Sequence, residues 1–241
     1  MKKIMTMLVL LATVAFAQAK TLVIYYSYTN NVHRIVNELR TQIEADVIRV
    51  EPAEKGLDYA ANNYAIGSAL ISAIRNNPNN PESYPAIDPV NVNLDEYDTI
   101  IIGAPLWWSN MAAPMQTFLF QHGMEMAGKN IGLIVSSASS GISGVEGDAK
   151  RLIPDGKFLS PSLWIRSSQT SNAATLISDW LKAIGYESLA GIESIVNDSA
   201  KTMAIYNLSG QRVAGSENLP KGIYIVRYLE GNVIQTKKII L

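Results

Sequence analysis

The sequence predicts an α/β protein: a doubly wound parallel sheet of five strands, followed by a small all-β module. Short apolar runs rich in β-branched residues alternate with stretches of helical periodicity from residue 21 to about residue 186. The run at residues 21–26 is too apolar for either face to meet water, which is typical of a central strand in a parallel sheet. After Tyr186 the helical periodicity stops, and short alternating strands separated by glycine-containing turns replace it.

The first half of the sheet is expected from two strands and two helices. Residues 21–26 form a β-branched and aromatic run, and residues 31–41 carry apolar side chains at helical spacing. Residues 45–50 predict a second strand, and the Ala-rich stretch 58–75 is expected to be helical. The prolines within residues 76–88 predict a loop before the next strand.

The second half repeats the alternation. The run DTIIIG at 98–103 predicts a third strand, and Pro114 suits the first turn of a helix that extends to about Met126. Residues 130–136 predict a fourth strand, and residues 145–152 a short helix that Pro154 ends. The remaining expected elements are a fifth strand at 160–165 and a helix at 173–184, which Gly185 ends.

The N-terminus has the features of a secretory signal. Two lysines precede an apolar stretch, and Ala17-Gln18-Ala19 is a small-x-small cleavage pattern. The apolar stretch is too short to span a bilayer. We therefore expect an extracytoplasmic protein, either periplasmic, cell-surface or secreted. The expected domains are a signal peptide at 1–19, an α/β domain at 20–186, a linker at 187–201 and a small β module at 202–241.

Composition excludes several functions. The formal net charge is −1, so electrostatics provides no reason to expect a nucleic-acid partner. No apolar run after the signal is long enough to predict a membrane span. The chain has no cysteine, which excludes disulfides and thiol catalysis. It has only two histidines, so a His-rich metal site or a catalytic triad is not expected. No Walker or dinucleotide-binding glycine motif is present at the right spacing.

The loop after the first expected strand carries polar side chains at a helix start. Free backbone N–H groups and the helix dipole favour an anion there. Hydroxyl and amide side chains can add hydrogen bonds to a phosphate without a lysine. The alternative is an ordinary helix cap. The residues concerned are Ser27, Thr29, Asn30 and Asn31.

The loop after the third strand carries two adjacent tryptophans. Trp107 and Trp108 lie where a surface loop is expected, and an exposed indole is favourable there if it covers something apolar. A flat conjugated ring suits an indole face. Alternatively, one or both indoles pack into the core, and we expect this of one of them. The loop also contains Pro105, Leu106, Ser109 and Asn110.

The loop after the fourth strand is small and polar, with Ser137, Ala138, Ser139 and Gly141. Such a segment lets a planar ligand approach backbone amides that can bond to ring carbonyl oxygens. Loops after parallel strands meet at one sheet edge. The three loops together therefore predict a phosphate site, a stacking surface and a backbone rim, which match the parts of FMN.

At these residues the chain resembles the flavodoxin family, in particular the branch with a Gly-x-Pro-x-Trp-Trp loop. The resemblance covers about residues 20–186 and rests on "YYSYTNNV", "DEYDTIIIGAPLWWSNMAAPMQTFL" and "VSSASSGISG". Asn30 replaces a glycine of the family's first loop, Val32 replaces its last threonine, and Ser109 replaces the glycine after the tryptophans. Asn tolerates a positive φ better than other non-glycine residues. Because Val32 lacks the hydroxyl of the threonine that it replaces, we expect weaker phosphate binding.

The resemblance implies a flavodoxin-like fold that binds FMN and transfers electrons to an unknown redox partner protein or a small quinone. It implies no catalytic side chain and no metal. Two alternatives stay open: an NAD(P)H-dependent quinone reductase on the same fold, and a cofactor-free binding module. The C-terminal stretch "IYNLSGQRV…LPKGIYIVRY…KKIIL" resembles the sorting modules of exported Bacteroidetes proteins. The implied cofactor-binding residues are Ser27, Thr29, Asn30, Asn31, Val32, Pro105, Leu106, Trp107, Trp108, Asn110, Ser137, Ala138, Ser139 and Gly141.

Overall fold

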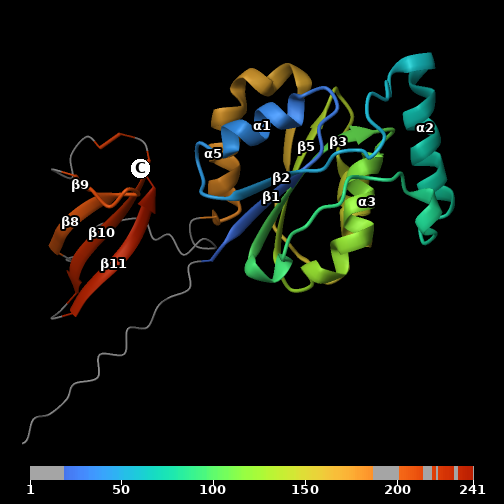
Figure 1. The fold of residues 1–241 in the computed structure, drawn as a ribbon. Helices are drawn as coiled ribbons and strands as arrows, with labels where there is room; N and C mark the ends of the chain where they lie inside the picture. The colour runs from blue at the N-terminus through green and yellow to red at the C-terminus, as the bar shows by residue number, and fades with distance from the viewer. Residues whose placement is uncertain (1–18, 187–200, 214–218, 221, 231–232, 241) are drawn as a thin grey trace, which may run out of the picture.

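The computed structural model describes residues 19–186, 201–213, 219–220, 222–230 and 233–240. The predicted signal peptide, apart from Ala19, and the predicted linker, apart from Lys201, lie outside these ranges. The larger domain is a parallel sheet with helices on both faces (Figure 1). Its strands are β1 (Thr21–Tyr25), β2 (Asp46–Arg49), β3 (Thr99–Trp107), β4 (Asn110–Met111), β5 (Asn130–Ser137), β6 (Lys157–Phe158) and β7 (Leu163–Arg166). Its helices are α1 (Asn31–Leu39), α2 (Ala61–Asn76), α3 (Ala113–His122), α4 (Ser143–Leu152) and α5 (Ala173–Ala183).

The strand order is β2-β1-β3-β5, and β6 and β7 share the fifth position, both pairing with β5. All of these pairs are parallel. The order reverses between β1 and β3, because the chain adds β2 on one side of β1 and β3 on the other. A parallel sheet opens a crevice at such a point, beyond the carboxyl ends of its strands.

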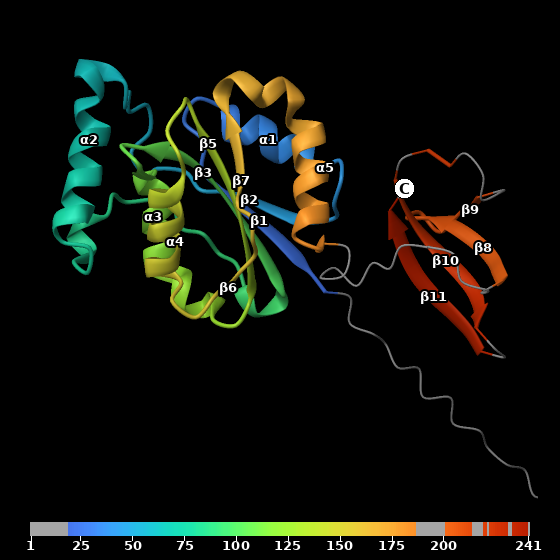
Figure 2. The same ribbon diagram turned by 180° about the vertical axis from the view of Figure 1, so that it is seen from behind.

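Alternating side chains of each strand face two separate cores. In β1, Leu22 and Ile24 join the core under α2, α3 and α4, whereas Val23 and Tyr25 join the core under α1 and α5. Figure 2 shows α1 and α5 on one face of the sheet and α3 and α4 on the other. This arrangement confirms the predicted doubly wound α/β fold.

Several element boundaries differ from the prediction. β3 runs on to Trp107, past the expected end at Gly103, because it forms a short hairpin with β4. The fifth position holds two short strands where one was expected at 160–165. Helix α2 begins at Ala61, and three of its first residues have left-handed backbone conformations: Asn62, Asn63 and Tyr64.

The C-terminal module is a four-stranded antiparallel sheet in the order β11-β10-β8-β9. Ile205, Tyr224, Val226 and Ile239 form its small buried core. The Lys238 Nζ lies 2.8 Å from Glu44 Oε2 of the larger domain. The strands are β8 (Lys201–Asn207), β9 (Arg212–Val213), β10 (Ile223–Glu230) and β11 (Val233–Ile240).

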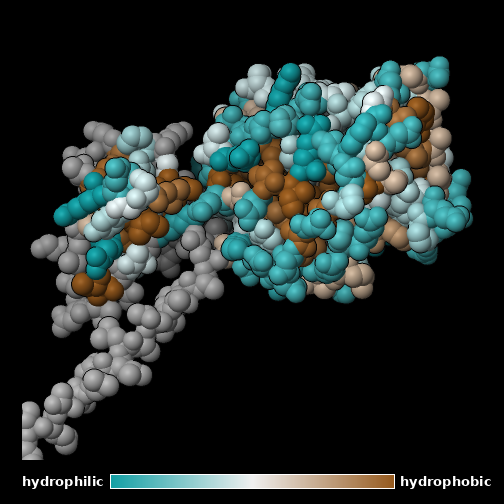
Figure 3. Space-filling view, viewed as in Figure 1, coloured by the Kyte–Doolittle hydropathy of each residue, from teal (hydrophilic) through white to brown (hydrophobic). Residues whose placement is uncertain are grey.

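The surface of the larger domain is mostly hydrophilic in the view of Figure 3, with apolar side chains gathered over the sheet edge formed by β2. None of the helices within the described ranges is both long enough and apolar enough to cross a bilayer.

Candidate functional site

A pocket of about 510 Å³ lies beyond the carboxyl ends of β1, β3 and β5. Its position is the point where the strand order reverses, and its volume is within the range of about 300–1,000 Å³ that small-molecule sites occupy. All three predicted loops contribute to it. The predicted residues that line it are Ser27, Thr29, Asn31, Val32, Pro105, Leu106, Trp107, Trp108, Ser137 and Ala138.

The loop between β1 and α1 presents free backbone donors. Asn30 has φ 62°, a left-handed conformation that asparagine tolerates better than other non-glycine residues. Among the described residues, no acceptor is bonded to the backbone N–H groups of Asn30, Asn31 or Val32. The Ser27 Oγ accepts the His33 N–H at 3.2 Å, so the Ser27 hydroxyl hydrogen is left to point elsewhere. These groups form an electropositive opening at the start of α1.

The two tryptophans have different environments. Trp107 is only 9% exposed and packs against Tyr59 with ring centroids 4.9 Å apart, whereas Trp108 is 42% exposed. Their rings are nearly perpendicular, with centroids 6.5 Å apart. One indole therefore belongs to the core, as expected, and the other stands at the pocket wall. The β3–β4 hairpin determines that Trp107 is the buried indole and Trp108 the exposed one, because Trp107 ends the strand and Trp108 begins the turn.

The loop after β5 is held by the Ser137 hydroxyl at the end of that strand. The Trp164 Nε1 donates to Ser137 Oγ at 2.8 Å, and the Ser137 hydroxyl donates to the Ser140 carbonyl at 2.9 Å. Ser137 is buried with its neighbour Ser136, and both line the pocket. This loop forms a rim whose polar side chains are already partly bonded within the protein.

Four predicted residues do not line the pocket: Asn30, Asn110, Ser139 and Gly141. Asn30 contributes its backbone conformation, and its side chain is exposed without a capping bond. The Asn110 amide turns away and donates to Asp148 Oδ2 at 3.1 Å. Ser139 and Gly141 lie exposed at the tip of their loop.

The segment from residue 58 to α2 supplies pocket residues that the sequence analysis did not assign. Tyr59 lines the pocket beside Trp107, although the sequence favoured a helix start at this position. Tyr64 is 52% exposed and meets Trp108 edge-to-face with centroids 6.2 Å apart. No local pattern placed them here. The full set of additional lining residues is Tyr28, Tyr59, Ala60, Tyr64, Gly67, Ser136 and Ser167.

The pocket lining contains no charged side chain. Asp58 directly precedes Tyr59, one of the pocket tyrosines. Its carboxylate accepts a hydrogen bond from the hydroxyl of another pocket tyrosine, Tyr28, at 2.6 Å. This bond lowers the pKa of Asp58 and raises the pKa of Tyr28. Burial raises the pKa of Tyr59. These tyrosines are therefore neutral at physiological pH. In the part of the chain that the structure describes, no cluster of three or more His, Asp or Glu residues could hold a metal.

Comparisons with known proteins agree with this architecture. In solved structures, the chain is similar to a candidate flavoprotein from Bacteroides eggerthii, with 25% identity over 69% of this chain and 98% of that one and a TM-score of 0.56. A candidate flavoprotein from Bacteroides uniformis is 25% identical over 67% of this chain and 99% of that one, with a TM-score of 0.52.

A flavoprotein from Lactobacillus acidophilus, solved in complex with FMN, shares the fold. It is 20% identical over 65% of this chain and 99% of that one, with a TM-score of 0.50. A family model described as flavodoxin matches residues 20–184, which is more than half of the chain. The chain therefore belongs to the flavodoxin family.

Proposed function

We propose that this protein binds FMN in the pocket and serves as an electron carrier. The observation that carries the proposal is the convergence of free backbone N–H groups, an exposed indole and a serine-rich rim on one neutral pocket of about 510 Å³. Each of these matches one part of FMN: its phosphate, its conjugated ring and its ring carbonyl oxygens.

The opening of α1 would hold the phosphate. The backbone N–H groups of Asn30, Asn31 and Val32 lack partners among the described residues, and the Ser27 and Thr29 hydroxyls lie beside them. Hydrogen bonds from amides at a helix start to an anion are charge-assisted, and they are stronger than bonds between neutral groups. The site therefore needs no cation to hold a phosphate.

The other end of the pocket would hold the ring. Trp108 offers an exposed indole face, and Pro105, Leu106 and Ala138 contribute small or apolar surface between β3 and β5. Stacking on an indole adds about 0.5–1.5 kcal/mol to what area burial contributes. The Tyr59 and Trp107 rings close the inner wall and keep water away from that side.

When bound, FMN supplies the electron transfer itself, and the protein needs no acid–base residue for it. The chain's residues bind the phosphate, orient the ring and exclude water from one of its sides. No described lining residue carries a charged side chain, so the electrostatic contribution of the lining comes from the backbone N–H groups at the start of α1.

The relatives support the proposal. The flavoprotein from Lactobacillus acidophilus was solved with FMN, and the Bacteroides proteins are described as candidate flavoproteins. We further propose that residues 1–19 direct export, that the protein acts outside the cytoplasm, and that the C-terminal β module assists sorting. The redox partner would be a protein or a small quinone.

A second candidate is an NAD(P)H-dependent quinone reductase. The observation in its favour is the aromatic outer wall, where Tyr64 and Trp108 are 52% and 42% exposed on the pocket. A planar acceptor could stack there beside the ring.

Titration of the purified chain with FMN tests the proposal. Quenching of flavin fluorescence and a bound-flavin absorption spectrum are expected. Riboflavin, which lacks the phosphate, is the matched control and is expected to bind more weakly. If neither the wild type nor Asn30→Gly binds FMN, the cofactor-free binding module becomes the better account. Steady oxidation of NAD(P)H with a quinone would favour the reductase.

A further inference from the structure

We infer that Asp148, a residue of α4 outside the pocket, is a positioning residue that sets the orientation of the Trp108 indole. The turn between β3 and β4 connects Trp107 to Asn110. Trp108 and Ser109 are its two central residues, with φ of 46° and 62°. Two positive φ values define the hairpin turn that prefers Asn-Gly, because most side chains crowd the backbone in this conformation. A Trp-Ser pair adopts it only where the surroundings impose it.

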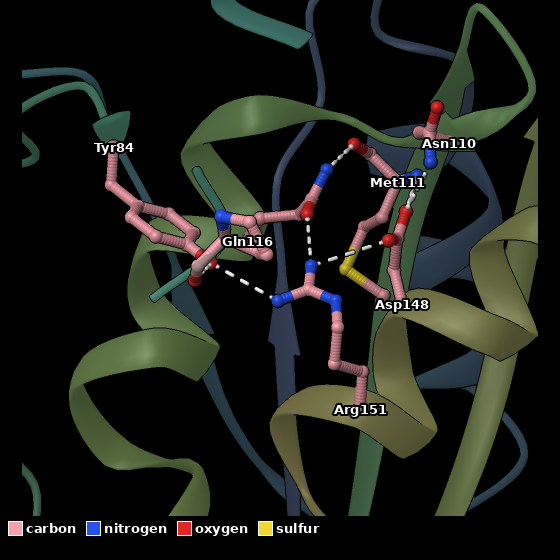
Figure 4. Close-up of polar contacts among 7 residues, drawn as sticks. Tyr84, Asn110, Met111, Gln116, Asp148 and Arg151 are labelled. Carbon is pink, nitrogen blue, oxygen red and sulfur yellow. Dashed lines mark hydrogen bonds and ion pairs between the residues drawn. The ribbon is translucent and has the colours of Figure 1, made fainter. Parts of the chain in front are cut away.

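Two side chains hold Met111, the second residue after this turn. The Met111 N–H donates to Asp148 Oδ2 at 2.8 Å, and the Met111 carbonyl accepts from Gln116 Nε2 at 2.7 Å. Asp148 Oδ2 also accepts from Asn110 Nδ2 at 3.1 Å. Both polar groups of the Met111 backbone are thus bonded to side chains from two different helices (Figure 4). This arrangement fixes the strand β4 that closes the hairpin.

Arg151 ties the two side chains together. Its guanidinium donates to Asp148 Oδ1 at 3.3 Å, to Gln116 Oε1 at 2.9 Å and to the Tyr84 hydroxyl at 3.1 Å. Figure 4 shows Arg151 between these three acceptors. The Asp148 side chain is only 10% exposed and Gln116 is buried, whereas the Arg151 side chain is 35% exposed. The hydrogen bonds at the Met111 end of the network are therefore the ones shielded from water and strengthened.

Helix α4 also contacts the turn directly. A Cβ on Gly144 would lie 1.7 Å from the Ser109 carbonyl oxygen, so only glycine lets the helix approach this closely. The turn is therefore held at Ser109 by the helix backbone and at Met111 by Asp148. Since Trp108 immediately precedes Ser109, these two contacts restrict its backbone conformation. The part of this inference that concerns FMN rests on the proposed function, whereas the part that concerns the turn does not.

Asp148 needs its negative charge for this role. Its carboxylate accepts from three donors, namely Asn110 Nδ2, the Met111 N–H and the Arg151 guanidinium. An asparagine at this position would offer only one side-chain oxygen, so its amide nitrogen would face either Arg151 or the β4 donors. Asp148→Asn is therefore expected to loosen the turn while leaving the side-chain volume unchanged.

The experiment compares Asp148→Asn with Gln116→Glu and with Ile134→Val. Asp148 and Gln116 together form a clamp on the Met111 backbone. Gln116→Glu keeps the side-chain shape and an acceptor for Arg151, but it loses the donor to the Met111 carbonyl. It therefore tests the clamp at Gln116. Ile134→Val removes a buried methyl group from the core under α1 and α5, so it lowers the free energy of unfolding without touching the clamp. Asp95→Asn, on an exposed carboxylate before β3, controls for charge.

The first readout is the protein without FMN. Nuclear magnetic resonance is expected to show a shifted Trp108 indole N–H signal in Asp148→Asn and in Gln116→Glu, and faster amide exchange at Met111 in Asp148→Asn. Neither is expected in Ile134→Val or Asp95→Asn. Unchanged Trp108 signals in both clamp variants would overturn the inference. If Asp148→Asn does not fold, Gln116→Glu decides the outcome.

The second readout is FMN affinity. Both clamp variants are expected to raise the dissociation constant. For Asp148→Asn we expect about tenfold, because a bond to a charged carboxylate is lost, and for Gln116→Glu about fivefold, because a bond between neutral groups is lost. Ile134→Val is expected to leave it unchanged despite its lower stability. Equal weakening in Ile134→Val would mean that Asp148 acts only on stability and would overturn the inference. If the wild type does not bind FMN, the proposed function fails and the first readout still decides.

Discussion

Gly67 of α2 and Trp108 of the β3–β4 turn are in such close contact that a Cβ on Gly67 would lie 2.9 Å from Cζ3 of the indole. The helix therefore approaches the ring as closely as its backbone allows. This contact places one side of Trp108 against α2 and leaves the rest of the indole facing the pocket. The segment after β2 thus takes part in the site through a residue without a side chain.

Gly67→Ala is expected to displace the indole without destabilising the fold. The displaced atoms belong to the ring of Trp108, which is 42% exposed and so has room to shift, and alanine is favoured over glycine inside a helix by about 1 kcal/mol. FMN binding is expected to weaken while the free energy of unfolding holds or rises. Fluorescence titration and urea denaturation measure the two effects.

Gly147→Ala is the matched control for this variant. Gly147 is an exposed residue inside α4, and a Cβ there would have nothing within 4 Å. It should gain the same helical preference and leave FMN affinity unchanged. A Gly67→Ala protein that binds FMN as tightly as the wild type would show that Trp108 does not form the ring wall.

Val32→Thr is expected to strengthen FMN binding. In the absence of FMN it is expected to lower the free energy of unfolding. Val32 lines the pocket at the start of α1 and is 1% exposed, so a threonine of the same shape places a hydroxyl at the proposed phosphate site. One added hydrogen bond is worth about 1 kcal/mol, or about fivefold in the dissociation constant.

Without a ligand, the buried hydroxyl of this variant lacks a partner and costs on the order of 1 kcal/mol. Titration with FMN and thermal unfolding with and without FMN separate the two effects. Weaker binding of FMN by Val32→Thr would place the phosphate elsewhere. Inorganic phosphate, added alone, serves as a competitor for the same donors.

The left-handed backbone at Asn30 predicts different effects for two substitutions. Asn30→Ala is expected to lower the free energy of unfolding by about 1 kcal/mol, because alanine is strained at φ 62° and the Asn30 side chain makes no capping bond that would also be lost. Asn30→Gly is expected to be neutral or slightly stabilising. Urea denaturation compares the three proteins, and equal stability of the alanine variant would contradict the assigned conformation.

The hydrogen bond between Tyr28 and Asp58 predicts a pH dependence. It lowers the pKa of Asp58 in the folded protein, so its contribution to stability is present above the ordinary carboxyl pKa of about 3.9. That contribution is lost as the pH falls through the lower folded value. In Tyr28→Phe the pKa of Asp58 is expected to rise toward its ordinary value.

Carbon-detected titration of the Asp58 carboxyl group measures this change. The difference in unfolding free energy between wild type and Tyr28→Phe is expected to shrink as the pH falls below about 4. A difference that stays constant down to the lower pKa would mean that the bond does not act on the ionised carboxylate. Tyr64→Phe is the matched control, because the Tyr64 hydroxyl makes no hydrogen bond to Asp58.

The sequence by itself determined the alternation of strands and helices in the α/β domain and the sheet edge at which the three predicted site segments meet. These follow from local causes. Apolar periodicity sets strands and helices, and parallel strands bring their following loops to one sheet edge. The expectation that one indole packs into the core was also correct, since two adjacent indoles rarely stay exposed together.

Only the tertiary structure decided which residues complete the site. Tyr59, Tyr64 and Gly67 reach the pocket because α2 packs on the sheet through Ile71 and Ile74, a contact between segments far apart in the sequence. Asn110 does not line the predicted site, because its amide donates a hydrogen bond to Asp148 of α4. Long-range packing and side-chain hydrogen bonds decide such placements, and neither leaves a periodic pattern in the amino-acid sequence.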